Sequence, residues 1–238
     1  LEFNCDNLKI INFGILQGCS SITGILKIPN QCTEIALCAF ESCSEISNEI
    51  SFPSTLESIG NYAFKNCDKI KININLPSSF KLLGTASFHH CQAITQITSL
   101  GDNLQEIPDS AFLECINAEG SLNIPQSVLT IGPNAFRFCE KLSSLHFNGH
   151  NLMNISGGAF CCCYGLRCDL TIPDSCELLE YSVFENSVFN GHIISLGSNL
   201  KTIGDSCFRG TNFTGDLTIP NSVIEIGNYS FYGCSTFS

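Results

Sequence analysis

The stretch IGPNAFRFC, residues 131–139, decides the fold, because close copies of it recur along the whole chain. Clear copies are IGNYAFKNC (59–67), IPDSAFLEC (107–115), IGDSCFRGT (203–211) and IGNYSFYGC (226–234). The motif phenylalanine returns every 24 residues, and after 23 residues at the last copy: Phe40, Phe64, Phe88, Phe112, Phe136, Phe160, Phe184, Phe208 and Phe231. Leu16 takes this position one period before Phe40, which makes about ten copies. A period of this length indicates a repeat architecture.

Each repeat has three parts with different local preferences. The first, as in GSLNIP (120–125), alternates apolar and polar residues and ends in proline, which is typical of a half-buried strand. The second, as in SVLTIG (127–132), is also extended and turns at a glycine, where we expect positive φ: Gly60, Gly84, Gly132, Gly204 and Gly227. The third, the AFxxC stretch, is too short for a free helix, so we expect one helical turn with phenylalanine and cysteine facing inward.

A single repeat cannot bury its own apolar face, so the repeats are expected to stack into a solenoid. Like residues then form ladders through one continuous core. We expect this core ladder to contain the motif phenylalanines and the cysteines three positions later: Cys19, Cys43, Cys67, Cys91, Cys115, Cys139, Cys163 and Cys234. Residues 1–238 are thus predicted to form one domain of about ten repeats of 23–24 residues. Because neither end carries a polar capping sequence, we expect either a segment of a longer array or a chain whose ends are exposed.

The repeat pattern LxIPxSVxxIGxxAFxxCxxL resembles that of the BspA-like (Treponema-type) leucine-rich repeat surface proteins. The resemblance implies a right-handed, curved leucine-rich repeat solenoid of β-rich α/β class. A parallel β-sheet would line the concave face, with short helical turns and extended segments on the other side. It also implies a non-enzymatic surface protein that adheres to host cells, matrix proteins or other microbes. Ser187 and Thr211 replace the repeat cysteine and are expected to weaken their repeats.

Composition and motifs argue against several functions. The 238 residues are 44% hydrophobic and carry a net charge of −11, which disfavours nucleic acid as a partner. The sequence contains no run of about 18 apolar residues, so it predicts no transmembrane helix. G-x-S-x-G, HExxH and P-loop motifs are absent, so we expect no enzyme, cofactor or small-molecule substrate. His89 and His90 fall at expected solvent positions, and no metal role is expected for the histidines.

The densest cysteine cluster, AFCCCYGLRC (159–168), divides into unequal parts. Cys163 belongs to the core ladder, whose thiols we expect to be reduced because neighbouring Cβ atoms would be too far apart for disulfides. The other cysteines outside the core columns are expected at or near the surface: Cys5, Cys38, Cys161, Cys162 and Cys168. A local disulfide from Cys168 to Cys161 or Cys162 stays open. Zinc is not expected, because no paired C-x-x-C motif occurs.

Polar residues on the expected outer face of the first strand are the binding candidates: Lys27, Ser51, Asn75, Ser99, Asn123, His146, Thr171, Ser195 and Thr218. They have two interpretations, a merely soluble strand face or a shallow surface for a protein, or possibly glycan, ligand. About ten coils at strand spacing would extend about 50 Å, enough for a protein partner. Two functions therefore remain: the ectodomain of a surface adhesin, secreted or on the cell, or an intracellular (cytoplasmic) scaffold with the same solenoid.

Overall fold

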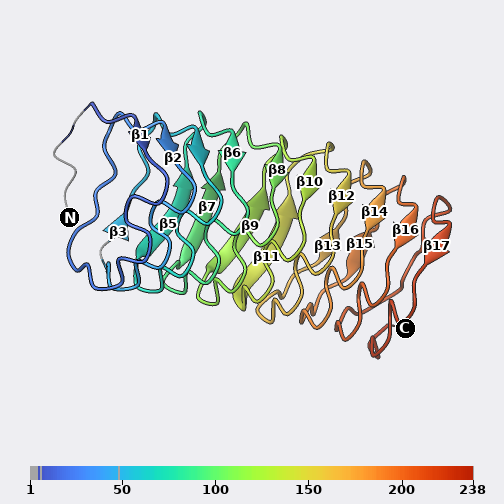
Figure 1. The fold of residues 1–238 in the computed structure, drawn as a ribbon. Helices are drawn as coiled ribbons and strands as arrows, with labels where there is room; N and C mark the ends of the chain where they lie inside the picture. The colour runs from blue at the N-terminus through green and yellow to red at the C-terminus, as the bar shows by residue number, and fades with distance from the viewer. Residues whose placement is uncertain (1–4, 6, 48, 238) are drawn as a thin grey trace.

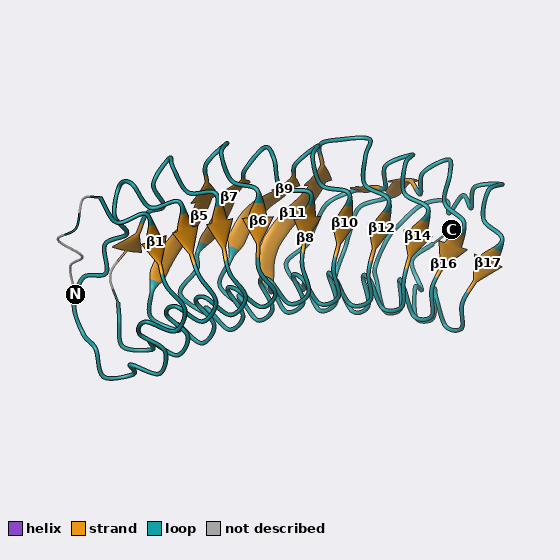
Figure 2. Cartoon of the chain, turned by 45° about the horizontal axis from the view of Figure 1, so that its top comes forward, coloured by secondary structure: helices purple, strands orange, loops and turns teal. Residues whose placement is uncertain are grey.

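The computed structural model describes residues 5, 7–47 and 49–237 as a row of stacked coils (Figure 1). The strands of successive coils lie side by side from one end of the row to the other. This arrangement confirms the predicted parallel-sheet solenoid. Figure 2 shows strands and loops but no helix, so the described part of the chain also has no helix able to cross a membrane.

Two parallel ladders run along the solenoid. The short-strand ladder consists of β1 (Ile10–Ile11), β2 (Glu34–Ile35), β4 (Ser58–Ile59), β6 (Leu82–Leu83), β8 (Glu106–Ile107), β10 (Thr130–Ile131), β12 (Asn154–Ile155), β14 (Leu178–Leu179), β16 (Thr202–Ile203) and β17 (Glu225–Ile226). It forms one sheet from β1 to β6 and a second from β8 to β17. Its register follows the repeat, as in the pairing of Ile131 with Ile155.

The second ladder, here called the long-strand ladder, consists of β3 (Glu49–Ile50), β5 (Lys71–Leu76), β7 (Gln96–Leu100), β9 (Glu119–Ile124), β11 (Lys141–Phe147), β13 (Leu170–Thr171) and β15 (Ile193–Ser195). Strands β3 to β11 form one parallel sheet, and β13 pairs with β15. Burial alternates strictly along β5, where the apolar residues point inward and Lys71, Asn73 and Asn75 are exposed. The outward side of this ladder is the long-strand face.

A stack of phenylalanine rings fills the space between the ladders. Neighbouring motif rings from Phe40 to Phe231 have centroids 5.2–5.6 Å apart. Phe112 and Phe136, for example, are inclined by only 6°. Phe40 to Phe208 are fully buried, and Phe231 in the last coil is half-buried. Each ring therefore covers the face of the next and excludes water from it.

The AFxxC stretch is a series of overlapping turns, so the predicted short helical turn is wrong. Around Phe136, alternate N–H groups close local turns, such as Cys139 N to Phe136 O at 3.1 Å. The N–H groups between them donate to the next coil, such as Phe136 N to Ala159 O at 2.8 Å. A helical turn would not send every second N–H to the next coil, because helical N–H groups bond to carbonyls four residues earlier in the same segment. Asn134 and Phe138 adopt φ of 52° and 59°, which gives the chain this alternation.

Glycine precedes five of the turns, and the reason for it differs from the one expected. Gly60, Gly84, Gly132, Gly204 and Gly227 are not among the residues with positive φ. A Cβ built on Gly132 would instead lie 2.6 Å from the backbone N of Asp109 in the preceding coil. In these five coils the close approach of two backbones favours glycine, whereas the same column holds Ala36, Pro108, Ser156 and Glu180 in other coils. The left-handed conformation falls two residues later.

The repeat cysteine is a hydrogen-bond donor as well as a small apolar residue. The thiol of Cys139 donates to the carbonyl of Phe112, in the preceding coil, at 3.3 Å, and Cys163 donates to Phe136 at 3.2 Å. Ser187 makes the same bond to Phe160 at 2.5 Å and also accepts the N–H of Cys163. Serine therefore preserves the link between coils at this position instead of weakening it. Thr211 differs, because its hydroxyl donates to Phe208 of its own coil.

Candidate binding surface on the long-strand face

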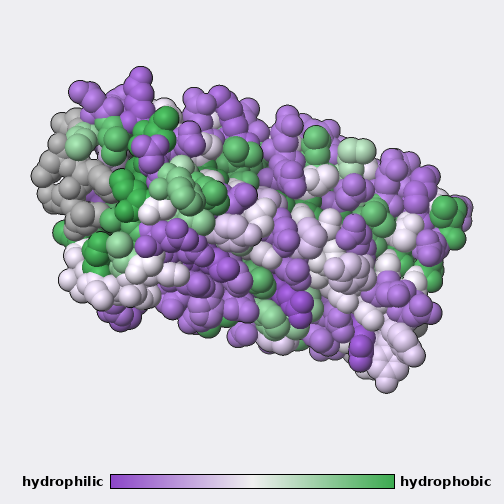
Figure 3. All heavy atoms as spheres, in the orientation of Figure 1, coloured by the Kyte–Doolittle hydropathy of each residue, from purple (hydrophilic) through white to green (hydrophobic). Residues whose placement is uncertain are grey.

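The structure places six of the nine predicted binding residues in strands of the long-strand ladder, and Lys27, Ser51 and Thr218 outside these strands. Seven of the nine are exposed: Lys27, Ser51, Asn75, Asn123, His146, Thr171 and Thr218. Ser99 and Ser195 are half-buried. The ladder brings Asn123 directly beside His146, and Asn75 beside Ser99. In the view of Figure 3, hydrophilic residues form the larger continuous areas and hydrophobic residues are scattered among them.

Irregular register is confined to the long-strand ladder among the described strand pairs. The β5–β7 pairing shifts after Ile74, which leaves Thr98 as an extra residue in β7. Comparable shifts leave Ser143 unpaired in β11 and Ile194 unpaired in β15. Bulges of this kind redirect side chains and are common beside functional sites. The long-strand face is therefore the side on which the solenoid departs from its own repeat.

Two of these bulges lead into the same unusual corner. The sequence Ser-Leu-Gly follows at 99–101 and again at 195–197, where neighbouring coils end their strand in proline. Gly101 has a φ of 77°, and its N–H donates to the Ser99 hydroxyl at 3.1 Å. Ser195 accepts the N–H of Gly197 in the same way at 3.0 Å. The hydroxyls of these two predicted site residues thus hold the corners.

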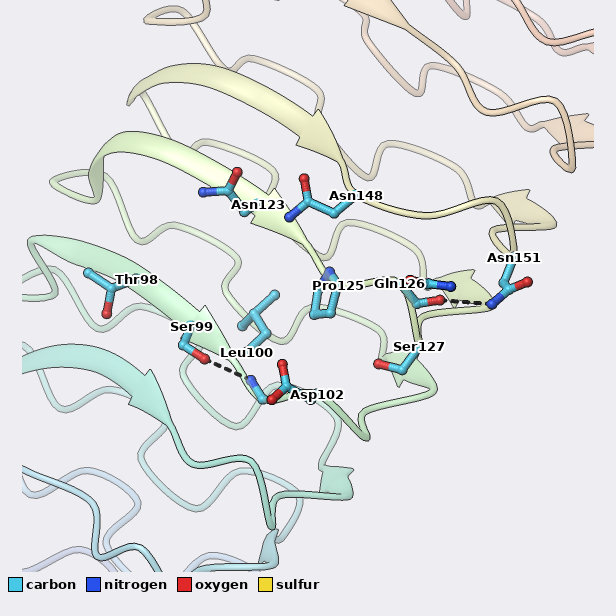
Figure 4. Close-up of a pocket in the computed structure, with 11 residues that line it drawn as sticks. Thr98, Ser99, Leu100, Asp102, Asn123, Pro125, Gln126, Ser127, Asn148 and Asn151 are labelled. Atoms are coloured by element: carbon cyan, nitrogen blue, oxygen red, sulfur yellow. Dashed lines mark hydrogen bonds between the residues drawn. The ribbon is translucent and has the colours of Figure 1, made fainter.

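A hollow of about 650 Å³ opens beside Gly101, at the ends of β7 and β9 (Figure 4). It is lined by Thr98, Ser99, Leu100, Gly101, Asp102, Asn123, Pro125, Gln126, Ser127, Asn148 and Asn151. Asp102 is the only charged residue of this lining. Asn123 and Asn148 lie next to each other on one side of the hollow, and Asp102 and Ser127 lie on the other (Figure 4).

Asn148 enters this hollow because its coil has an enlarged corner. Phe147 pairs with Ile124, 23 residues earlier, whereas Ile155 pairs with Ile131, 24 residues earlier, so one residue is added between them. The backbone N–H of Asn148 extends the ladder by donating to the carbonyl of Ile124 at 3.0 Å. A Cβ on the next residue, Gly149, would lie 2.6 Å from Cα of Gln126. Glycine therefore lets the enlarged corner pack against the preceding coil.

A second hollow, of about 570 Å³, continues from Asn148 toward β15. It is lined by Leu145, His146, Phe147, Asn148, Cys168, Asp169, Thr171 and Ile194. The two hollows share Asn148, and we call them together the corner groove. Inspection of single columns had found Asn123, His146 and Thr171 but had missed Asp102, Gln126, Asn148 and Asn151. The signals that could have found them are the two Ser-Leu-Gly corners, 96 residues apart, and the added residue near Asn148.

The histidines are placed partly as expected. His146, His150 and His192 are exposed, but His89 and His90 are half-buried, contrary to prediction, because the turns of adjacent coils stack on them. Burial lowers the pKa of His89. His90 has its Nδ1 2.7 Å from Oε2 of Glu114, in the next coil. No group of three or more His, Cys, Asp or Glu residues within 5, 7–47 and 49–237 is arranged to hold a metal ion.

The cysteine cluster contradicts the predicted surface location. Cys161 and Cys162 are only 4% and 7% exposed, and Cys38 is 8% exposed, because the turns of both neighbouring coils pack directly against these positions. Cys168 is half-buried and Cys5 exposed. The Sγ atoms of Cys161 and Cys162 lie 3.4 Å apart, and all sixteen cysteines are free thiols. The local disulfide that the sequence left open is thus not formed in this structure.

The buried thiols are expected to resist alkylation. Burial raises the pKa of Cys115 to about 12, so at pH 8 only about one thiol in ten thousand is the reactive thiolate. Iodoacetamide at pH 8 should label exposed Cys5 readily and Cys115 only after urea unfolds the chain. Because the pKa is raised, a change from pH 7 to pH 9 should leave native Cys115 unlabelled. Peptide mass spectrometry measures both sites, and equal labelling rates would contradict the buried ladder.

Comparison with known proteins places the fold in a family. The profile of the BspA type leucine rich repeat region matches residues 9–120 and 105–238, in six copies. A leucine-rich repeat protein of T. pallidum is 24% identical over 67% of this chain and 72% of its own, with a TM-score of 0.56. A leucine-rich cell surface protein of Faecalibacterium prausnitzii is 20% identical over 97% and 76%, with a TM-score of 0.50.

A leucine-rich repeat protein of Bacteroides ovatus is 23% identical over 96% of this chain and 80% of its own, with a TM-score of 0.49. A search of curated protein sequences gave no significant match. The structural similarities concern the fold, whereas the family profile spans nearly the whole sequence. The chain therefore belongs to the BspA-type leucine-rich repeat family.

Proposed function

We propose that this chain is a non-enzymatic protein-interaction module, the repeat ectodomain of an adhesin that is exposed on the cell surface or secreted. Its ligands would be proteins, or possibly glycans, of host cells, matrix or other microbes. The observation that carries the proposal is the concentration of bulges and Ser-Leu-Gly corners on the long-strand face, beside the corner groove. Membership of the BspA-type family supports it, as does the description of the F. prausnitzii neighbour as a cell surface protein.

A cytoplasmic scaffold is the second candidate. Sixteen free cysteines suit a reducing compartment, where disulfides are rare. The same face would then bind an intracellular protein. Labelling intact cells with an antibody against the chain separates the two, because an adhesin is labelled without permeabilisation. A signal that appears only after permeabilisation would overturn the adhesin proposal.

Three arginine substitutions should strongly weaken adhesion through the long-strand face. Asn75, Asn123 and Thr171 are exposed there in three coils, so Asn75→Arg, Asn123→Arg and Thr171→Arg together place bulky cations across it. Binding of the labelled, purified chain to cultured mammalian epithelial cells should fall at least tenfold, which corresponds to about 1.4 kcal/mol. Flow cytometry over a concentration series measures the change.

The matched control carries the same three charges on the opposite side. Gln105, Leu129 and Met153 are exposed beside the short strands, and their exchange for arginine should leave binding within about twofold of the native chain. Equal losses in both variants would indicate a nonspecific effect of charge and contradict the proposed face. A native chain that binds no cells would overturn the adhesive function itself.

A further inference from the structure

We propose that the hollow beside Gly101 is a binding subsite for a neutral saccharide, such as a glycan chain on a surface glycoprotein. The inference names the ligand chemistry of the proposed function and rests on it.

The lining favours an uncharged ligand. It contains no lysine or arginine, and its only charged residue, Asp102, is acidic. Phosphate, sulfate or an acidic sugar would therefore meet no cationic partner and would be repelled by this carboxylate. The whole chain, with a net charge of −11, adds to that repulsion. A different hollow, at the start of the long strands, is lined by Lys71 and Lys141 together with Glu49 and Glu119, so the lack of basic residues is particular to the hollow beside Gly101.

Side-chain amides supply the hydrogen-bonding groups. Asn123 and Asn148 are exposed, and neither side chain makes a hydrogen bond to another residue lining the hollow (Figure 4). An amide presents a donor and an acceptor side by side, the pair that two adjacent hydroxyls of a sugar can satisfy. Nδ2 of Asn151 donates to the backbone carbonyl of Gln126 at 3.1 Å, which fixes this side chain at the rim (Figure 4).

The floor of the hollow is apolar. Leu100 and half-buried Pro125 lie between the polar side chains of the two sides (Figure 4). Leu100 is only 1% exposed, so the ring of Pro125 supplies the apolar contact. A sugar ring has C–H groups on its faces and hydroxyls around its edge, so it matches a small apolar floor with polar walls. Binding sites of this type combine apolar contact with a few well-placed polar groups.

The spacing of the coils distinguishes a glycan from a peptide. Neighbouring strands lie about 4.8 Å apart, close to the length of one hexose unit in an extended polysaccharide. A glycan along the solenoid axis would thus place successive sugars opposite successive coils, at Asn123, His146 and Thr171. An extended peptide advances about 3.3 Å per residue and would lose register with the coils within two or three residues.

The test uses the intact chain and a panel of neutral hexasaccharides built from glucose, mannose, galactose or N-acetylglucosamine. A sulfated hexasaccharide and an uncharged Gly-Ser-Asn peptide of similar length are the comparison probes. Isothermal titration should show binding of at least one neutral hexasaccharide and of neither comparison probe. The double variant Asn123→Ala/Asn148→Ala should weaken that binding at least tenfold, with an unchanged urea midpoint.

The matched control is Asn30→Ala/Asn221→Ala, which removes two exposed asparagines from corners in distant coils and should leave saccharide affinity unchanged. Three results would overturn the subsite: no neutral saccharide binds, the peptide binds in an Asn123-dependent manner, or the double variant retains full affinity. Cell adhesion that depends on the long-strand face without any saccharide binding would overturn the subsite and leave the proposed function standing. Saccharide binding without cell adhesion would overturn the proposed adhesive function and leave the subsite standing.

Discussion

Replacing Phe136 by alanine is expected to lower the free energy of unfolding by about 3–5 kcal/mol, the usual cost of deleting a buried ring. Phe136 is fully buried, and its ring stacks on Phe112 at 5.2 Å and on Phe160 at 5.4 Å. The substitution leaves a gap in the middle of the ring stack that neither neighbour can fill. Urea denaturation followed by circular dichroism measures the change.

The same change at an exposed position is the control. Phe13 is 64% exposed, so Phe13→Ala should alter the free energy of unfolding by less than about 0.5 kcal/mol. In a solenoid each coil contacts only its neighbours, so the gap at Phe136 should also weaken the coupling between the two halves. A broader or two-step transition is therefore expected. A single sharp transition with native stability would contradict the continuous ring stack.

Replacing Gly84 by alanine is expected to destabilise the chain by about 1–3 kcal/mol or more, although only one methyl group is added. The new Cβ would lie 2.2 Å from the backbone N of Asn61 and 2.2 Å from the carbonyl carbon of Gly60. Backbone atoms cannot rotate away as a side chain can, so the two coils have to separate. The midpoint of urea unfolding measures the loss.

The control for Gly84 lies in the same column of another coil. Ser156 occupies the equivalent position and already carries a Cβ, so Ser156→Ala should be nearly neutral. If Gly84→Ala had as small an effect on the urea midpoint as Ser156→Ala, the result would contradict the close approach of the two backbones at Gly84. A parallel Gly84→Ser variant, which mimics Ser156, should be at least as destabilising as Gly84→Ala.

The repeat period predicts the solenoid because stacking copies of one motif must bring equivalent residues together. The constant spacing of Phe112, Phe136 and Phe160 in the sequence directly predicts the ring stack. The turn was mispredicted because the N–H of Phe136 bonds to Ala159, in the next coil, and local propensity takes no account of that partner. The burial of Cys161 and Cys162 was missed because it too depends on the neighbouring coils, whose turns pack against these residues.

The corner groove could be predicted only in part. Counting columns assumes that every coil keeps the same register, and this assumption finds Asn123 and Thr171. It cannot place Asn148, whose position depends on one residue added after β11. Bulges such as that at Thr98 arise from pairing with a neighbouring strand, so they become visible only once both strands are in place.

The alternating N–H groups of the turn also have a mechanical meaning. In each turn, donors such as Asn134, Phe136 and Phe138 reach the next coil, so these hydrogen bonds run along the solenoid axis, as do those of both ladders. A load that pulls the ends apart along this axis acts on every junction between coils at once, and the weakest junction separates first. The chain would then lengthen by releasing coils in succession, as a spring-like tether that gives way stepwise under traction while its remaining coils stay folded.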